Sequence, residues 1–139
     1  MKQHFDTLHV KTKGPGLYDF TRDAARAVAT SGIENGLLTC FVQHTSASLI
    51  VQENADPDVL ADLESFMQRL VSRDMSLYRH TTEGPDDMPA HIRSMLTNTS
   101  LSIPVRGSAP ALGTWQGLYL FEHRDRAHDR AIMLHVIGE

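Results

Sequence analysis

Apolar positions follow two different periods along the chain. Short runs of β-branched, aromatic and aliphatic residues over 5–12, 37–42 and 48–52 predict three strands. Over residues 20–28 the apolar positions recur at helical spacing instead, and Ser31-Gly32 is typical of a helix end. The first part of the chain is therefore expected to hold three strands and one helix.

Two more helices are predicted in the middle of the chain. Asp56-Pro57 indicates a helix start, because aspartate caps free backbone N–H groups and proline is tolerated in the first turn. Apolar positions then form one stripe as far as Leu70. A polar loop over 72–84 separates this helix from the next, which begins by the same device at Asp87-Met88-Pro89.

The last third of the chain reads as strands. Residues 101–105 predict an edge or irregular strand because they include Pro104. The runs 115–122 and 131–137 are apolar at nearly every position and flank a polar link, which predicts a β-hairpin covered on both faces. We expect an α+β fold of mostly antiparallel β-sheet, with about three helices packed on one face and a partner subunit on the other. Residues 1–139 are expected to form a single domain.

Composition removes several classes of function. Lys and Arg total 13 against 17 Asp and Glu, and this net charge of −4 argues against a sequence-independent nucleic-acid binder. No stretch approaches the ~20 apolar residues needed to cross a bilayer, and no secretory signal is visible. The one cysteine, Cys40, excludes an internal disulfide and a thiolate zinc cluster, and it reads as inert core. We therefore expect a cytoplasmic protein with neither a nucleic-acid nor a membrane partner.

Histidines offer the best candidate metal ligands. The chain has eight, and His44, His80 and His91 lie beside other polar residues at the predicted ends of elements. Three neutral imidazoles leave a divalent ion an open position for water or substrate. Their spacing matches no compact motif, and a lone histidine is more often a surface or hydrogen-bonded polar group. We expect His123 and His128, which flank the polar link, to be solvated.

The other polar residues near element ends each have two interpretations. Asp56 and Asp58 either cap a helix or orient a metal-bound water or ligand. Asp86 and Asp87 are equally plausible as caps, and their roles stay open between capping and the site. Asn54 shares the interpretation given to the first pair.

The hydroxyl, cationic and aromatic side chains in these segments also have two interpretations each. Thr45 and Ser46 suit either phosphate binding or a turn. Arg79 suits an anion or is a surface charge, and Trp115 either stacks on a heteroaromatic ring or anchors the core.

Taken in order, these segments resemble the signatures of the YjbQ family, whose members are often described as secondary thiamine-phosphate synthases. The resemblance covers nearly the whole chain. The matching segments are His44-Thr45-Ser46-Ala47-Ser48, Glu53-Asn54-Ala55-Asp56-Pro57-Asp58-Val59, Tyr78-Arg79-His80, Asp87-Met88-Pro89-Ala90-His91-Ile92 and Leu112-Gly113-Thr114-Trp115-Gln116-Gly117.

The resemblance implies a trimer that packs antiparallel sheets around a threefold axis. It also implies a site near three histidines that binds a divalent metal ion, with zinc favoured. The activity attributed to the family joins hydroxymethylpyrimidine diphosphate to thiazole phosphate and releases pyrophosphate. We accordingly expect metal ligands His44, His80 and His91, catalytic residues His44, Asp58, His80 and His91, and binding of the phosphorylated substrate by Thr45, Ser46, Asn54, Arg79, Trp115 and Gln116.

Two other functions fit the same residues. One is a metal-dependent hydrolase of a small phosphate ester, with Asp58 or Glu53 as the base. The other is a non-enzymatic trimeric protein that binds a metal or small ligand. Both the transferase and the hydrolase need a metal ion and an anion pocket, so the residues alone do not separate them.

Overall fold

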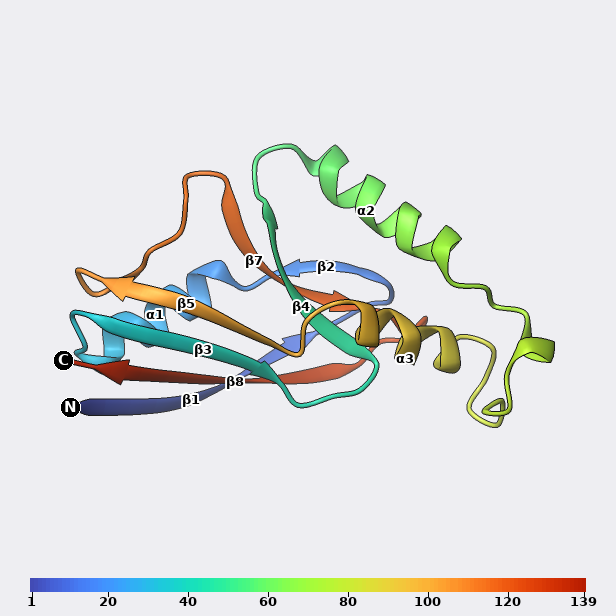
Figure 1. Ribbon diagram of the computed structural model, residues 1–139, viewed down its shortest axis with the longest axis horizontal. Coiled ribbons are helices and arrows are strands. Elements are labelled where there is room, and N and C mark those ends of the chain that lie inside the picture. The colour runs from blue at the N-terminus through green and yellow to red at the C-terminus, as the bar shows by residue number, and fades with distance from the viewer.

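The computed structural model describes residues 1–139, and its strands form two antiparallel sheets (Figure 1). The five-stranded sheet has the order β1 (Lys2–Lys11), β8 (Asp129–Gly138), β3 (Gly36–Val42), β5 (Ser100–Arg106) and β6 (Ala109–Pro110). The three-stranded sheet has the order β2 (Gly16–Asp19), β7 (Gln116–Glu122) and β4 (Ala47–Glu53). β3 and β4 follow one another in the sequence but belong to different sheets, so residues 43–46 carry the chain between them.

Three α-helices accompany the sheets, as the sequence predicts. They are α1 (Thr21–Ser31), α2 (Pro57–Leu70) and α3 (Asp87–Leu96), with a short 3-10 helix, η1 (Met75–Leu77), in the expected polar loop. The helix ends follow local chemistry: Gly32 takes the left-handed conformation after α1 (φ 69°), and the Asp56 carboxylate accepts the N–H of Asp58 before α2 (2.9 Å). The expected α+β class is confirmed. No helix has the length and apolar character required to cross a membrane.

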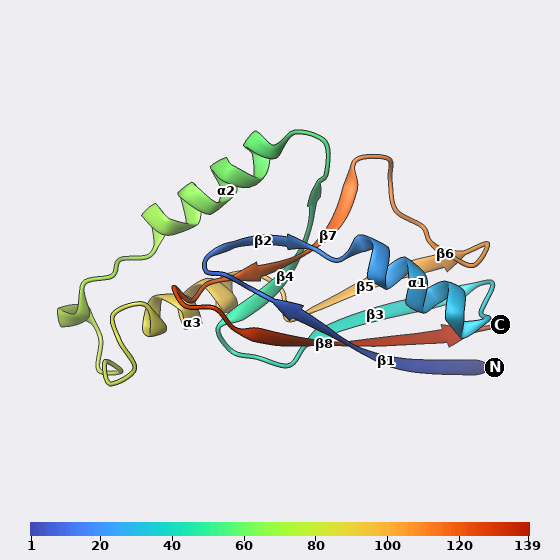
Figure 2. The same cartoon turned by 180° about the vertical axis from the view of Figure 1, so that it is seen from behind.

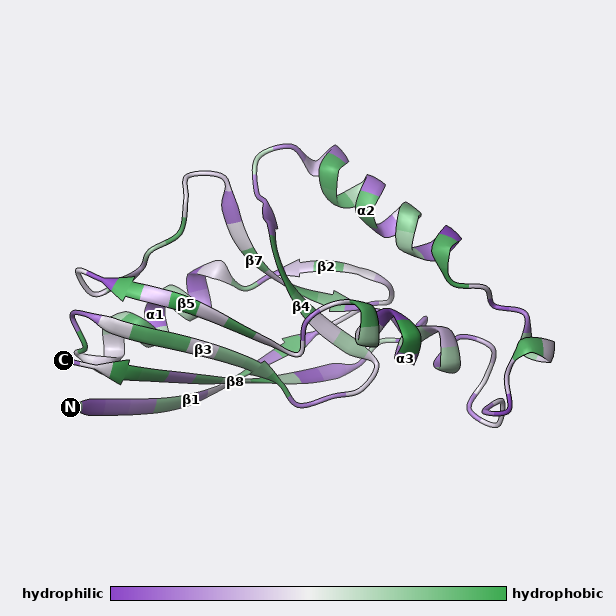
Figure 3. Cartoon of the chain, viewed as in Figure 1, coloured by the Kyte–Doolittle hydropathy of each residue, from purple (hydrophilic) through white to green (hydrophobic).

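The hydrophobic core lies between the inner faces of the two sheets and α1. Strand β3 shows the period of two, with Leu38, Cys40 and Val42 buried and Leu37 and Phe41 exposed between them. Cys40 is inert core as expected, and burial raises the pKa of its thiol to about 12. Hydrophobic colouring follows β3, β5 and β8, whereas the first part of β1 is hydrophilic (Figure 3). α2 and α3 pack outside this core, beside β2 and β4 (Figures 1 and 2).

The predicted hairpin of the last two strands is wrong. β7 pairs with β2 and β4, whereas β8 pairs with β1 and β3 in the other sheet. The polar link between them crosses from sheet to sheet, and its first residue, His123, is buried rather than solvated (1% exposed). The imidazole of His123 lies 2.8 Å from the Ser48 hydroxyl, and burial lowers its pKa to about 3.

This topology changes what the apolar runs mean. In β7 every residue after Gln116 is buried within the chain itself, and Leu118 and Leu120 are fully buried in the core. Tyr119 and Phe121 line cavities under α2 together with residues of that helix. The strand is therefore covered on both faces without a partner subunit, which corrects the reason we gave for expecting one.

Strand β8 behaves differently, because its outward face is only partly covered. Ile132, Leu134 and Val136 are buried, whereas Met133 and Ile137, which point to the other face, are partly exposed. Their neighbours Phe5, Leu37 and Phe41 on that face are exposed. We name this face, with Phe5, Leu37, Phe41, Met133 and Ile137, the outer sheet face.

Candidate functional site

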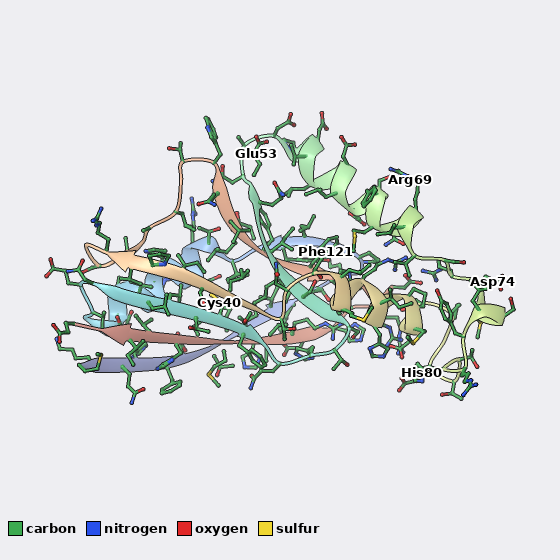
Figure 4. The ribbon with its side chains drawn as sticks, viewed as in Figure 1. Cys40, Glu53, Arg69, Asp74, His80 and Phe121 are labelled. Carbon is green, nitrogen blue, oxygen red and sulfur yellow. The ribbon has the colours of Figure 1, made fainter.

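Four side chains of metal-ligating type converge beside the start of α3. One ligand atom from each of His80, Glu83, Asp87 and His91 lies within 4.8 Å of the others. Asp87 and His91 are four residues apart on α3, which places them on one face of the helix. His80 and Glu83 come from the loop that follows η1, and Figure 4 shows His80 on that loop. We call these four residues the histidine–carboxylate cluster.

The Asp87 carboxylate is the centre of the cluster. Its Oδ2 lies 2.6 Å from Nε2 of His80 and 3.1 Å from Nε2 of His91, and Oε2 of Glu83 lies 3.2 Å from the same His80 nitrogen. The Asp87 side chain is 3% exposed, whereas that of His80 is 43% exposed. The cluster therefore has a buried acid at its base and opens to solvent through the histidines and Glu83.

The hydrogen bond at Nδ1 of His91 identifies the tautomer of its neutral ring. Its Nδ1 lies 2.9 Å from the carbonyl oxygen of Thr45. A carbonyl can only accept, so Nδ1 must carry a hydrogen. In the neutral ring, Nε2 then presents a lone pair to Asp87 Oδ2, and these two acceptors attract one another only when a proton or a metal ion lies between them. A backbone carbonyl that orients a histidine in this way is typical of metal ligands.

Charge inside the cluster favours the ionised acid. Burial alone would raise the pKa of Asp87, but the hydrogen bonds with His80 and Glu83 and the charges of His91 and Arg124 outweigh it and lower that pKa. The hydrogen bond with Asp87 raises the pKa of His80. Without a metal ion, the proton shared by His80 and Asp87 is therefore held on the imidazole of His80.

His44 lies outside this cluster. Its Nε2 accepts the N–H of Ala131 at 2.8 Å, and burial together with the charge of Arg130 lowers its pKa. Neither ring nitrogen offers a lone pair to the cluster in this arrangement. The structure thus brings together two of the three predicted ligands, His80 and His91, and adds two carboxylates to them.

Three other predicted residues gather elsewhere, at the start of α2. The Asn54 N–H donates to the carbonyl of Trp115 (2.9 Å), and Gln116 Oε1 accepts the N–H of Gly113 (2.8 Å). Trp115 is 63% exposed, so it does not anchor the core. Asp56 caps α2, and Asp58 is exposed in its first turn.

The two groups are separated by the whole of α2. Figure 4 shows Glu53 near one end of that helix and His80 beyond the other. The 14 residues of α2 rise roughly 20 Å. Within one subunit, Asn54, Trp115 and Gln116 do not adjoin the histidine–carboxylate cluster.

The expected phosphate-binding residues also divide. The Ser46 hydroxyl accepts from Arg130 Nη2 at 3.0 Å and is buried, so it is committed to the interior. Thr45 contributes its carbonyl to His91, and its side chain is exposed. Arg79 is exposed next to His80.

From the sequence, Glu83 and Arg124 receive no role, and Asp87 stays open between helix capping and a place in the site. The signal for the acids was present in two spacings, His80-x-x-Glu83 and Asp87-x-x-x-His91, which suit a turn and one helical face. Asp86 occupies the N-cap position of α3 but makes no side-chain capping bond there. Nothing local in the sequence links Arg124 to these residues.

Comparisons with known proteins place the chain in a family. The model of the family described as "UPF0047 protein YjbQ-like" matches residues 6–139. The chain is 54% identical over 138 residues to UPF0047 protein sll1880 of Synechocystis, covering 99% of this chain and 94% of that protein. It is 42% identical over 134 residues to UPF0047 protein YjbQ of Escherichia coli O157:H7, covering 96% of each.

Solved structures share the fold. A YbjQ-like protein of unknown function from Sulfolobus solfataricus P2 superposes with a TM-score of 0.90 at 26% identity, covering 99% of each chain. A YjbQ/UPF0047 family protein from Clostridium acetobutylicum gives 0.86 at 32% identity, covering 95% of this chain and 99% of that one. By its family match, its relatives and its fold, the chain belongs to the YjbQ family, also designated UPF0047.

Proposed function

We propose that the histidine–carboxylate cluster binds a divalent metal ion and that the protein uses it to act on phosphorylated small molecules. The single observation that carries the proposal is the pairing of His91 Nε2 with Asp87 Oδ2 at 3.1 Å, while the Thr45 carbonyl holds the hydrogen on Nδ1. Two imidazoles and a carboxylate suit zinc and several other divalent ions. Zinc is the first to test, with His80, Asp87 and His91 as ligands and Glu83 within reach.

The activity we propose is that of a thiamine-phosphate synthase, which the family resemblance suggests. The leaving pyrophosphate carries several negative charges, and a divalent ion would supply the charge that stabilises it. The Ser46 hydroxyl is committed to Arg130. Arg79, exposed beside His80, is therefore better placed than Ser46 to bind a phosphate oxygen.

The direct test is formation of thiamine phosphate from hydroxymethylpyrimidine diphosphate and thiazole phosphate by the purified protein. His80→Ala and His91→Ala should each abolish product, and His44→Ala tests the role expected for that residue. His4→Ala, a change in the edge strand β1, is the matched control and should leave the rate unchanged. Equal rates for the wild type and both cluster variants would contradict the proposal.

A metal-dependent phosphate-ester hydrolase is the second candidate, and Glu83 favours it. Its carboxylate is largely exposed, is held by no arginine side chain and lies 3.2 Å from His80, so it is placed to take a proton from a water at the cluster. Asp58 and Glu53, the bases we expected, lie at the other end of α2. Hydrolysis of a phosphate-ester panel, lost on chelation and in Glu83→Gln, would support this candidate, and turnover of either kind would exclude a purely binding role.

We also propose that the protein is a cytoplasmic trimer. Two features support a multi-subunit form: the uncovered apolar side chains of the outer sheet face, and the separation of Trp115 and Asn54 from the cluster within one subunit. Phe41 is 46% exposed on that face and pairs with Met133 of β8.

Phe41→Glu should therefore convert a trimer into a folded monomer of 15.5 kDa in light scattering. Thr30→Glu, on the exposed side of α1, is the control and should stay trimeric. A wild-type monomer at micromolar concentration would overturn the proposal.

A further inference from the structure

The Arg124 guanidinium contacts two residues of the histidine–carboxylate cluster, Asp87 and Glu83, and the adjoining Asp86. Nη1 lies 2.7 Å from Oδ1 of Asp87, Nε donates to Oδ2 of Asp86 at 2.8 Å, and Nη2 donates to the carbonyl of Glu83 at 3.2 Å. The Arg124 side chain is 10% exposed. One buried cation thus holds the loop that carries Glu83 and the first residue of α3.

The backbone of Arg124 is itself held by a buried side chain. Its backbone N–H donates to Oε2 of Glu122 at 3.1 Å, and Glu122 is completely buried. The next residue, Asp125, donates its N–H to the Asp86 carboxylate at 2.9 Å. The guanidinium therefore projects from the end of β7 with little freedom to move.

The backbone of the loop at residues 83–86 bends around the Arg124 side chain. Gly84 has φ +101°, a conformation that residues with a Cβ rarely adopt, and a Cβ there would lie 3.2 Å from Oδ1 of Asp86. The turn at Gly84 brings the Glu83 carbonyl and the Asp86 carboxylate to the same guanidinium.

As a result, the two oxygens of the Asp87 carboxylate have different partners. Oδ1 is occupied by Arg124, and only Oδ2 faces His80 and His91. A carboxylate held in this way can give a metal ion one oxygen but not two.

We infer that Arg124 is a positioning residue that fixes Asp87 as a one-oxygen ligand aimed between His80 and His91. The inference rests on the proposed metal site. The planar fork matters as well as the charge, because an ammonium group carries all its donors on one nitrogen and cannot span the three separate groups that the guanidinium contacts. A purely structural role would instead require that Arg124 contributes to folding and nothing to the geometry of the bound metal.

The test compares metal binding by the wild type, Arg124→Gln and Arg124→Lys after removal of metal with a chelator. Zn²⁺ affinity is measured by calorimetry, and the visible spectrum of the Co²⁺ form reports the number and geometry of the ligands. Arg126→Gln is the matched control, because it removes the same charge from an exposed position of the same link. Thermal melting of each metal-free variant reports the effect on folding separately.

We expect Arg124→Gln to weaken Zn²⁺ binding by about 10- to 100-fold, the range for groups that orient metal ligands. The Co²⁺ spectrum should change in Arg124→Gln, Arg124→Lys should recover part of the affinity, and Arg126→Gln should match the wild type. If Arg124→Gln does not fold, the comparison rests on Arg124→Lys, which keeps the charge.

The outcomes separate the two proposals. A wild-type protein that binds no divalent ion removes the metal site and this inference with it. Wild-type binding that is unchanged in both Arg124 variants, with an unchanged Co²⁺ spectrum, leaves the metal site standing and overturns the role of Arg124. A lower melting temperature with unchanged affinity would likewise show a structural role only.

Discussion

Two buried carboxylates, each paired with an arginine, differ in what they leave available. Glu122 accepts from the Thr12 hydroxyl (2.7 Å) and from Nε of Arg130 (2.8 Å) at one oxygen. Its other oxygen accepts from Arg130 Nη2 and from the N–H groups of His123 and Arg124. Asp87 gives one oxygen to Arg124 and presents the other to two imidazoles that open to solvent.

The pKa directions do not distinguish these acids, whereas the geometry does. Burial would raise the pKa of both, and in both it is outweighed, by Arg130 and Thr12 for Glu122 and by His80 for Asp87. Both oxygens of Glu122 are fully hydrogen-bonded to donors that are fixed in the buried interior, which is typical of a carboxylate with a structural role. Asp87 is half saturated, and its second oxygen faces groups that exchange protons or ligate metals. Incomplete saturation therefore marks the candidate site.

The largest effect is expected when the saturated acid is changed. Glu122→Gln leaves the Arg130 guanidinium, whose side chain is 4% exposed, without its counter-charge. Breaking one partner of a buried pair costs about 3–5 kcal/mol of unfolding free energy. Urea denaturation measures this loss, and Glu34→Gln at an exposed position should stay within about 0.5 kcal/mol of the wild type. A loss for Glu122→Gln no larger than that of the control would contradict the structural role.

A change of Asp87, whose carboxylate is only half occupied, should have the opposite profile: a large loss of metal affinity and a smaller loss of stability. Asp87→Asn removes the ligand charge, so Zn²⁺ binding should fall by more than the roughly 100-fold upper range for orienting groups. Stability should fall less than in Glu122→Gln, because Arg124 keeps the Asp86 carboxylate at 2.8 Å. Calorimetry and urea denaturation on the same samples give both quantities, with Asp62→Asn, at an exposed position of α2, as the control. Unchanged Zn²⁺ affinity in Asp87→Asn would remove Asp87 from the site.

Features that depend on neighbouring residues could be predicted from the sequence, whereas features that depend on distant residues could not. Both helix starts are predicted from local sequence and are observed, at Pro57 and at Asp87. The expected side-chain capping is present before α2, where Asp56 accepts the N–H of Asp58, whereas α3 has no side-chain capping bond. The pairing of 115–122 with 131–137 was wrong, because two apolar strands joined by a short polar link suit either a hairpin or a crossing between sheets. The choice depends on which strands pair with each, and those partners lie far away in the sequence.

The site was predictable by residue type but not by arrangement. His44, His80 and His91 are predicted together from their polar surroundings and the family resemblance, and the structure brings His80 and His91 together but not His44. The sequence leaves Asp87 open between capping and the site, because an acid at a helix start is already explained by capping or by the helix dipole. Arg124 reaches the cluster only through the packing of the β7 end against the α3 start, which no local pattern records.

The smallest effect, and the one that tests the protonation scheme, is the pH dependence of metal binding. The pKa of His80 is raised above its ordinary value near 6.5 by the hydrogen bond to Asp87, whereas the pKa of Asp87 is lowered. Below the raised value His80 carries a proton that a metal ion must displace, so binding should release that proton and weaken as the pH falls. Above it, His80 releases none. Calorimetry in buffers of different ionisation enthalpy measures the release.

His80→Gln gives the matched comparison, because it should lower the release by one proton below the raised pKa and by none above it. The stability of the metal-free protein should respond in the opposite sense. A raised folded-state pKa means that the His80–Asp87 ion pair stabilises fully below about 6.5 and that this contribution is lost as the pH rises through the raised value. Melting temperatures without metal should therefore decline over that window while those with Zn²⁺ increase. Parallel curves for the two forms would show that the ion does not replace the proton at the Asp87 oxygen.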